Sequence, residues 1–122
     1  MKSLIATLVL LSLTISISVL NRHYITSLTS ELHCRLDALP PVTEDDCLTQ
    51  AQELLEYWKA RENTVALSVS LTFIDRIGEQ AARLCACAEY QDTYGFATAL
   101  ALLRDAITNL DRGERFSVGN LL

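Results

Sequence analysis

The amino-acid sequence predicts an all-α protein, in which an N-terminal transmembrane or signal-anchor helix continues into an antiparallel bundle of about four helices. Composition is the first observation. Half of the 122 residues are hydrophobic, only 7% are aromatic, and four glycines and two prolines leave few helix breakers. The second observation is a continuous apolar segment at the N-terminus. The third is the recurrence of apolar residues every three or four positions beyond that segment, which is the spacing of one helix face.

The N-terminal segment runs from Ser3 to Leu20, eighteen residues without a charge. As a helix it rises about 27 Å, close to the thickness of a bilayer core of about 30 Å. Asn21 to Tyr24 follow as a polar and aromatic group suited to the headgroup interface. We therefore predict a signal anchor or signal peptide at residues 1–20 and an extracytoplasmic acidic helical domain at residues 21–122, with membrane contact through residues 3–20.

Orientation rests on the basic residues that flank this segment. Lys2 and the amino group stand before it, whereas the charge of Arg22 is soon balanced by Glu31. The positive-inside rule then predicts a single-pass protein of the cell membrane, with the N-terminus in the cytoplasm and the C-terminal domain outside. The alternative is a cleaved signal peptide and a secreted domain, for which Ser16 and Ser18 supply only a weak cleavage site.

Two predicted helices follow, on either side of Pro40-Pro41. The apolar positions of residues 21–39 form one stripe: Ile25, Leu28, Leu32, Leu36 and Leu39. Because neither proline donates a backbone hydrogen bond, we expect the first helix to end there. Thr43 is the predicted N-cap of the next helix, with acidic residues behind it at the positive end of the helix dipole. Its stripe comprises Cys47, Ala51, Leu54 and Trp58.

The periodicity changes phase after Trp58, which predicts a turn at Asn63-Thr64 and a third helix beyond it. The expected stripe of that helix comprises Leu67, Leu71, Ile74, Gly78, Ala81, Cys85 and Ala88. Asp92 is the predicted N-cap of a fourth helix that ends near Arg112-Gly113. Its stripe comprises Phe96, Leu100, Leu103, Ile107 and Leu110.

Charge limits the partners that the chain can have. Ten basic and fifteen acidic residues give a net charge of −5, so there is no basic surface for phosphates, and we expect no nucleic-acid partner. No glycine-rich phosphate loop, nucleophile motif or metal-ligand spacing occurs in the sequence. We therefore expect no catalytic residues, no cofactor and no metal site.

The four cysteines are the one reactive residue type present in number. On regular helices, Cys47 lies within its apolar stripe and Cys34 lies opposite its own. Cys85 and Cys87 are about 200° apart on one helix and cannot bond each other. We interpret Cys47 and Cys85 as small core residues, and Cys34 and Cys87 as candidate reactive thiols on outer faces. A disulfide or a metal site remains an alternative interpretation.

Four aromatic residues are candidate contacts for a partner. Trp58 is in phase with Leu54, which indicates a core position; if exposed, it would be the best candidate for a binding hot spot. Tyr57 lies beside it. Tyr90 and Tyr94 flank the last predicted turn, where they either cover the core or face a partner.

The chain also resembles domain of unknown function 4363, small proteins of Gram-positive bacteria with one N-terminal hydrophobic helix and an acidic helical remainder. The resemblance spans nearly the full chain. It rests on the apolar segment, LLEYWK at 54–59, FIDRIGEQAARL at 73–84 and ERFSVGNLL at 114–122. Leu71 stands where members often carry a histidine, which argues against a histidine-based activity. The resemblance implies a membrane-anchored helical protein and no particular reaction.

Two functions are compatible with these features. One is a non-catalytic interaction or accessory module at the cell envelope, bound to a membrane or envelope protein or to itself. The alternative is a thiol-based redox or metal-responsive protein that uses the surface cysteines Cys34 and Cys87.

The predicted anchor is tested by fractionation of cells that express the chain with a C-terminal tag. We expect the full-length chain in the membrane fraction, because about 27 Å of uncharged helix partitions stably into a bilayer. Recovery of a shortened chain from the soluble fraction alone would show that the segment is a cleaved leader.

Overall fold

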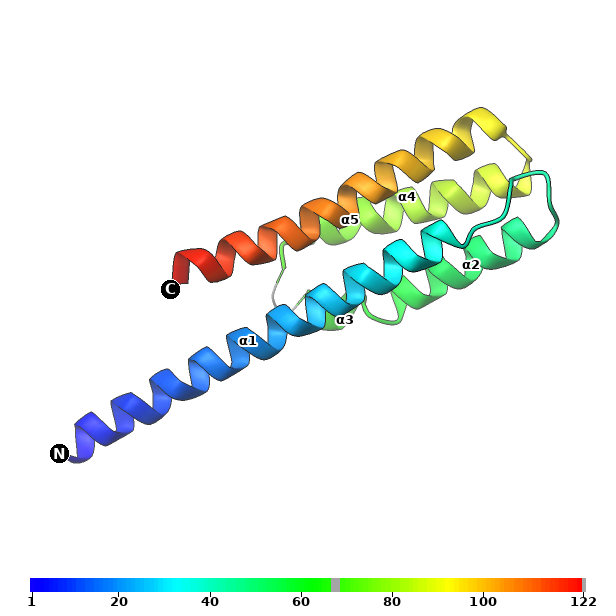
Figure 1. Cartoon of the computed structure of the whole chain (residues 1–122). Helices are drawn as coiled ribbons and strands as arrows, with labels where there is room; N and C mark the ends of the chain where they lie inside the picture. Colours follow the sequence, from blue (N-terminus) through cyan, green and yellow to red (C-terminus); the bar gives the residue numbers. More distant parts are fainter. Residues whose placement is uncertain (67–68, 122) are drawn as a thin grey trace.

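The computed structural model of the chain describes residues 1–66 and 69–121, with side chains as far as Arg112, and it confirms the all-α fold (Figure 1). Four long helices and one short one make up this described part. They are α1 (Lys2–Asp37), α2 (Asp46–Lys59), α3 (Glu62–Val65), α4 (Leu71–Glu89) and α5 (Thr93–Leu121). The four long helices alternate in direction, as the short connections predict.

The helices pack as an incomplete ring. α5 packs against both α1 and α4, and α4 packs in turn against α2. The fourth side, between α1 and α2, has little contact. The core between them is mainly aliphatic: Leu54, Leu84 and Ile107 are fully buried, and the Trp58 indole is fully buried among such residues.

α1 has two halves with different surroundings. It is a single helix of 36 residues, about 54 Å long, and its N-terminal half projects beyond the bundle (Figure 1). In the C-terminal half, Ile25, Leu28, Leu32 and Leu36 are buried against the other helices. None of the most apolar stretch is covered, so the described residues include one helix long and apolar enough to span a membrane or to act as a signal anchor.

Hydroxyl groups in the projecting half have partners within the helix itself. Thr7 Oγ1 donates to the Ser3 carbonyl oxygen at 2.8 Å, and Thr14 Oγ1 donates to the Leu10 carbonyl oxygen at 2.8 Å. A hydroxyl that is bonded in this way costs little to place in hydrocarbon, because it leaves no unpaired donor. These residues are therefore compatible with a membrane-spanning segment.

The connection from α1 to α2 differs in detail from the prediction. α1 ends at Asp37, just before the prolines, as expected. Thr43, however, is not the N-cap. The turn around Pro41 to Glu44 is closed by the Glu44 N–H donating to the Pro41 carbonyl at 2.9 Å, and α2 starts only after Asp45.

The predicted turn at Asn63-Thr64 is also wrong, because both residues lie inside α3. α2 already ends at Lys59, and α4 starts after Ser70, whose hydroxyl accepts from the Thr72 N–H at 3.3 Å. Leu67 of the expected stripe lies outside the described residues. Leu71 is 66% exposed, because the buried face of α4 is centred on Ile77, Ala81 and Leu84.

Asp92 caps α5 as predicted, since its Oδ1 accepts from the Gly95 N–H at 3.0 Å. α5 then runs past the expected end at Arg112-Gly113 as far as Leu121. Arg104 Nη1 lies 2.6 Å from Asp37 Oδ1, an ion pair that joins the middle of α5 to the last residue of α1. Both side chains are exposed, so this pair marks the relative level of α5 and α1 and adds little to stability.

At Gly95 the start of α5 passes close to the end of α4. A Cβ at this position would lie 2.5 Å from Asp92 Oδ2 and 2.9 Å from Cys87 Sγ. A side chain here would therefore displace either the capping carboxylate or the thiol.

We predict that Gly95→Ala lowers the free energy of unfolding by about 1–3 kcal/mol, through overpacking and a weakened cap. Gly78→Ala is the matched control, because its Cβ would meet only the flexible Glu62 side chain at 3.2 Å and Trp58 at 3.6 Å. We expect the control to lose less than about 1 kcal/mol, since alanine also favours the helix. Urea titration in detergent measures the free energy of unfolding of both variants. A loss in Gly78→Ala equal to that in Gly95→Ala would contradict the prediction.

Candidate functional site

The outer face of α5 is the most unusual surface of the bundle. Residues 93–103 contain no charged side chain, although one residue in five of the whole chain is charged. Phe96, Ala99 and Leu103 account for the buried side of this stretch. The side turned to solvent carries Tyr94, Ala97, Thr98, Ala101 and Leu102, and we call these five residues the outer α5 face.

These residues line a shallow groove of about 670 Å³ that also involves Thr93. Its volume falls in the range of small-molecule sites, but such sites enclose most of their ligand. This groove lies along one helix and is open to solvent, and its walls are mainly apolar. Its shape therefore suits the side chains of another protein better than an enclosed small ligand.

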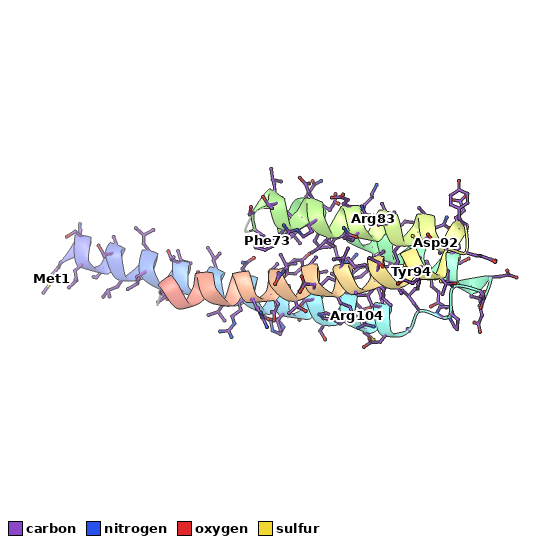
Figure 2. All side chains as sticks on the ribbon, turned by 90° about the horizontal axis from the view of Figure 1, so that it is seen from above. Met1, Phe73, Arg83, Asp92, Tyr94 and Arg104 are labelled. Carbon is purple, nitrogen blue, oxygen red and sulfur yellow. The ribbon has the colours of Figure 1, made fainter. Side chains whose placement is uncertain are left out.

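The outer α5 face lies far from the projecting end of α1. Figure 2 shows Tyr94 and Asp92 at one end of the molecule and Met1 at the other. The uncharged segment of α1 ends near Leu20, and Asp37, which pairs with Arg104 of α5, lies seventeen residues further on. At the rise of a helix this separation is about 25 Å. A bilayer around the apolar segment would therefore leave the face well above its surface.

The four predicted aromatic contacts are in different surroundings. Tyr90 and Tyr94 are 80% and 88% exposed, close to each other along the chain at the end of the bundle. Trp58 is fully buried, so of its two interpretations the core position is the one found. Its Nε1 has no hydrogen-bond partner among the described residues.

Tyr57 is half-buried between two guanidinium groups. The Cζ atom of Arg35 lies 4.2 Å from the ring centroid, and that of Arg61 lies 3.6 Å from it. Arg61 Nη1 also donates to the Tyr57 carbonyl oxygen at 3.0 Å, while Arg35 Nε donates to Glu31 at 3.1 Å. The Arg35–Tyr57 contact joins α1 to α2 at their sparsely packed side, and the Arg61–Tyr57 contact holds the residues that follow α2 against its end.

A second groove, of about 380 Å³, lies on this same side between the end of α1 and the start of α2. Its lining combines one arginine with two carboxylates and small polar side chains. The lining residues are Arg35, Ala38, Asp46, Thr49, Gln50 and Glu53. Arg35 is already paired with Glu31 and stacked on Tyr57, so the one positive charge of this groove is already engaged.

The cysteines differ in exposure, and all four are reduced. Cys34 is exposed, as expected. Cys87 is less exposed than its expected outer position, because its sulfur points toward Gly95 of α5. Burial raises the pKa of the Cys47 thiol, and the Glu44 carboxylate adds to this effect. Burial also raises the pKa of Cys85, with a further contribution from Cys47.

Within the part of the chain that the structure describes, no three side chains of histidine, cysteine, aspartate or glutamate are arranged to hold a metal ion. Comparison with protein families, with curated proteins and with solved structures finds no match to this chain. The surfaces described above are therefore the basis for any statement about function.

Sequence reasoning identified Tyr94 but missed the rest of the outer α5 face. The helix was predicted from its apolar stripe, which includes Phe96, Leu100 and Leu103 and accounts for only one side of it. The signal that would have found the face is the absence of charge on the other side. Ala97, Thr98 and Ala101 are small and uncharged where a solvated helix surface usually carries lysine, arginine or glutamate.

The exposures and pKa directions predict an order of thiol reactivity near neutral pH. Cys34 should alkylate first, and Cys47 should react at least about tenfold more slowly, because it is buried and its raised pKa leaves little thiolate. Raising the pH should accelerate Cys47 and Cys85, because their raised pKa values leave both thiols largely protonated near neutral pH. Peptide mass spectrometry after timed maleimide labelling measures this order, with the denatured chain as the reference. Equal rates in the folded chain would contradict it.

Proposed function

We propose that the chain is a membrane-anchored, non-catalytic accessory module that holds its helical bundle outside the membrane and binds another membrane or envelope protein there. The outer α5 face carries this proposal. Tyr94 and Leu102 remain 88% and 42% exposed on a helix side without charge, which is the composition of a recognition surface.

The charge of the bundle supports this choice of partner. Residues 21–122 carry nine basic and fifteen acidic residues, so an anionic lipid surface would repel them. The outer α5 face would lie about 25 Å from the edge of the hydrocarbon core, by the rise from Leu20 to Asp37. A partner that docks on it must therefore extend at least that far from the membrane. A second copy of the chain meets the same condition.

The resemblance to domain of unknown function 4363 agrees with this proposal, since it implies one N-terminal apolar helix and an acidic helical domain. The alternative function, a thiol-based redox or metal-responsive protein, is favoured by one observation, the exposure of Cys34. That alternative requires Cys34→Ser or Cys87→Ser to change the phenotype of the native host.

The test is recovery of a partner from membranes of the native host, solubilised in a mild detergent, with a C-terminally tagged chain. Ala101→Glu places a charge in the middle of the outer α5 face. We expect it to reduce recovery of the partner at least tenfold, because a buried unpaired carboxylate opposes docking.

Ala82→Glu is the matched control, because Ala82 is an exposed alanine of α4. It should leave recovery unchanged, and both variants should keep the melting temperature of the parent chain. Equal recovery with Ala101→Glu and the parent would exclude this face as the binding surface. Recovery of the chain alone, with no second protein in stoichiometric amount, would favour self-association.

A further inference from the structure

Cys47 and Cys85 lie on helix flanks that face each other. A Cβ on Gly78 would be 3.6 Å from Trp58 Nε1, so the flank of α4 that carries Gly78 is turned toward α2. Cys85 follows Gly78 by seven residues, which is within about 20° of two full turns. Cys47 precedes Trp58 by eleven residues, within about 20° of three full turns. The two thiols are thus on the same facing sides as the Trp58–Gly78 contact.

The two cysteines also lie at nearly the same height. Because α2 and α4 are antiparallel, Cys47 and Cys85 are displaced from the Trp58–Gly78 level in the same direction. At the helical rise, Cys47 lies about 16 Å from the level of Trp58, and Cys85 lies about 10 Å from the level of Gly78. The difference of about 6 Å shrinks further, because a side chain such as the indole leans toward the N-terminus of its own helix. The Cα atoms of the two cysteines are therefore separated along the helix axes by less than about 6 Å.

The other thiols are placed differently. Cys87 lies on the opposite flank of α4, and its sulfur is directed at Gly95 of α5. Cys34 is exposed on α1. The electrostatic effect of Cys47 on the pKa of Cys85 agrees with this pairing, since it requires the two groups to be close.

We propose that Cys47 and Cys85 are a disulfide-forming pair that joins α2 to α4. The oxidant is a disulfide of the thiol-exchange class, R–S–S–R. The Cys85 thiolate, the more accessible of the two, attacks one sulfur of the oxidant and releases the first R–S⁻. The Cys47 thiolate then attacks Cys85 Sγ in the mixed disulfide and displaces the second R–S⁻. Two protein thiols are oxidised, one external disulfide is reduced, and the two thiol protons end on the two R–SH products.

The bond would close the chain across residues 47–85, which include α3 and the connection between α2 and α4. Cross-linking a segment of this length restricts the unfolded chain strongly. We expect the oxidised chain to melt on the order of 10 °C above the reduced chain. The pairing itself does not depend on the proposed function.

The experiment uses the full chain in detergent, treated either with oxidised glutathione or with dithiothreitol. Non-reducing tryptic digestion should link the peptide of residues 36–59 to that of residues 84–104, and dithiothreitol should release both. Because the second peptide holds both Cys85 and Cys87, single variants are needed to assign the bond.

Cys87→Ala should keep both the linked peptide and the rise in melting temperature, whereas Cys85→Ala should lose both. Cys85 is only partly buried, so its variant should melt like the reduced parent chain. A link that survives in Cys85→Ala, a link to Cys34, or four free thiols after oxidation of the folded chain would each overturn the proposal.

Discussion

The structure depends on one constraint: a single unbroken helix must satisfy two different environments. Apart from its first residue, the first half of α1 is uncharged on all sides and uncovered, and the second half is apolar only along Ile25, Leu28, Leu32 and Leu36. No glycine or proline separates the two halves. The bundle is therefore built against the end of this helix. α5 packs against it, and the Asp37–Arg104 ion pair joins the middle of α5 to the last residue of α1.

Because α5 is held between α1 and α4, one side of it must remain outside the bundle. In most surface helices that side carries charge. In α5 it carries alanine, threonine and leucine next to Tyr94, and this departure from the usual pattern makes it the candidate site. The sparsely packed α1–α2 side differs, because there the guanidinium groups of Arg35 and Arg61 both lie close to the Tyr57 ring.

The sequence predicted the helices better than their boundaries. The stripes on α1 and α2 are the buried faces found, and Asp92 caps α5, because apolar spacing and short-range capping are local properties. Thr43 and Asn63 failed as boundary residues, since hydrogen-bonded turns that no periodicity reveals determine where α2 and α4 start. Tyr94 was predicted as a contact, but the remaining outer α5 face depends on which side of α5 its neighbours leave uncovered, and that is a tertiary property.

The continuity of α1 has a mechanical consequence. Because α1 has no hinge, it moves as one rigid helix. When its apolar half tilts, the bundle tilts by the same angle. A change in tilt of about 10°, of the size by which spanning helices adjust to bilayer thickness, would move a point 39 Å from the pivot by about 7 Å. Asp37 lies about that far from the middle of the apolar segment, 26 residues away at the helical rise. In a bilayer, the outer α5 face would then shift sideways with the lipid, so the local thickness of the membrane would set which neighbours it can reach.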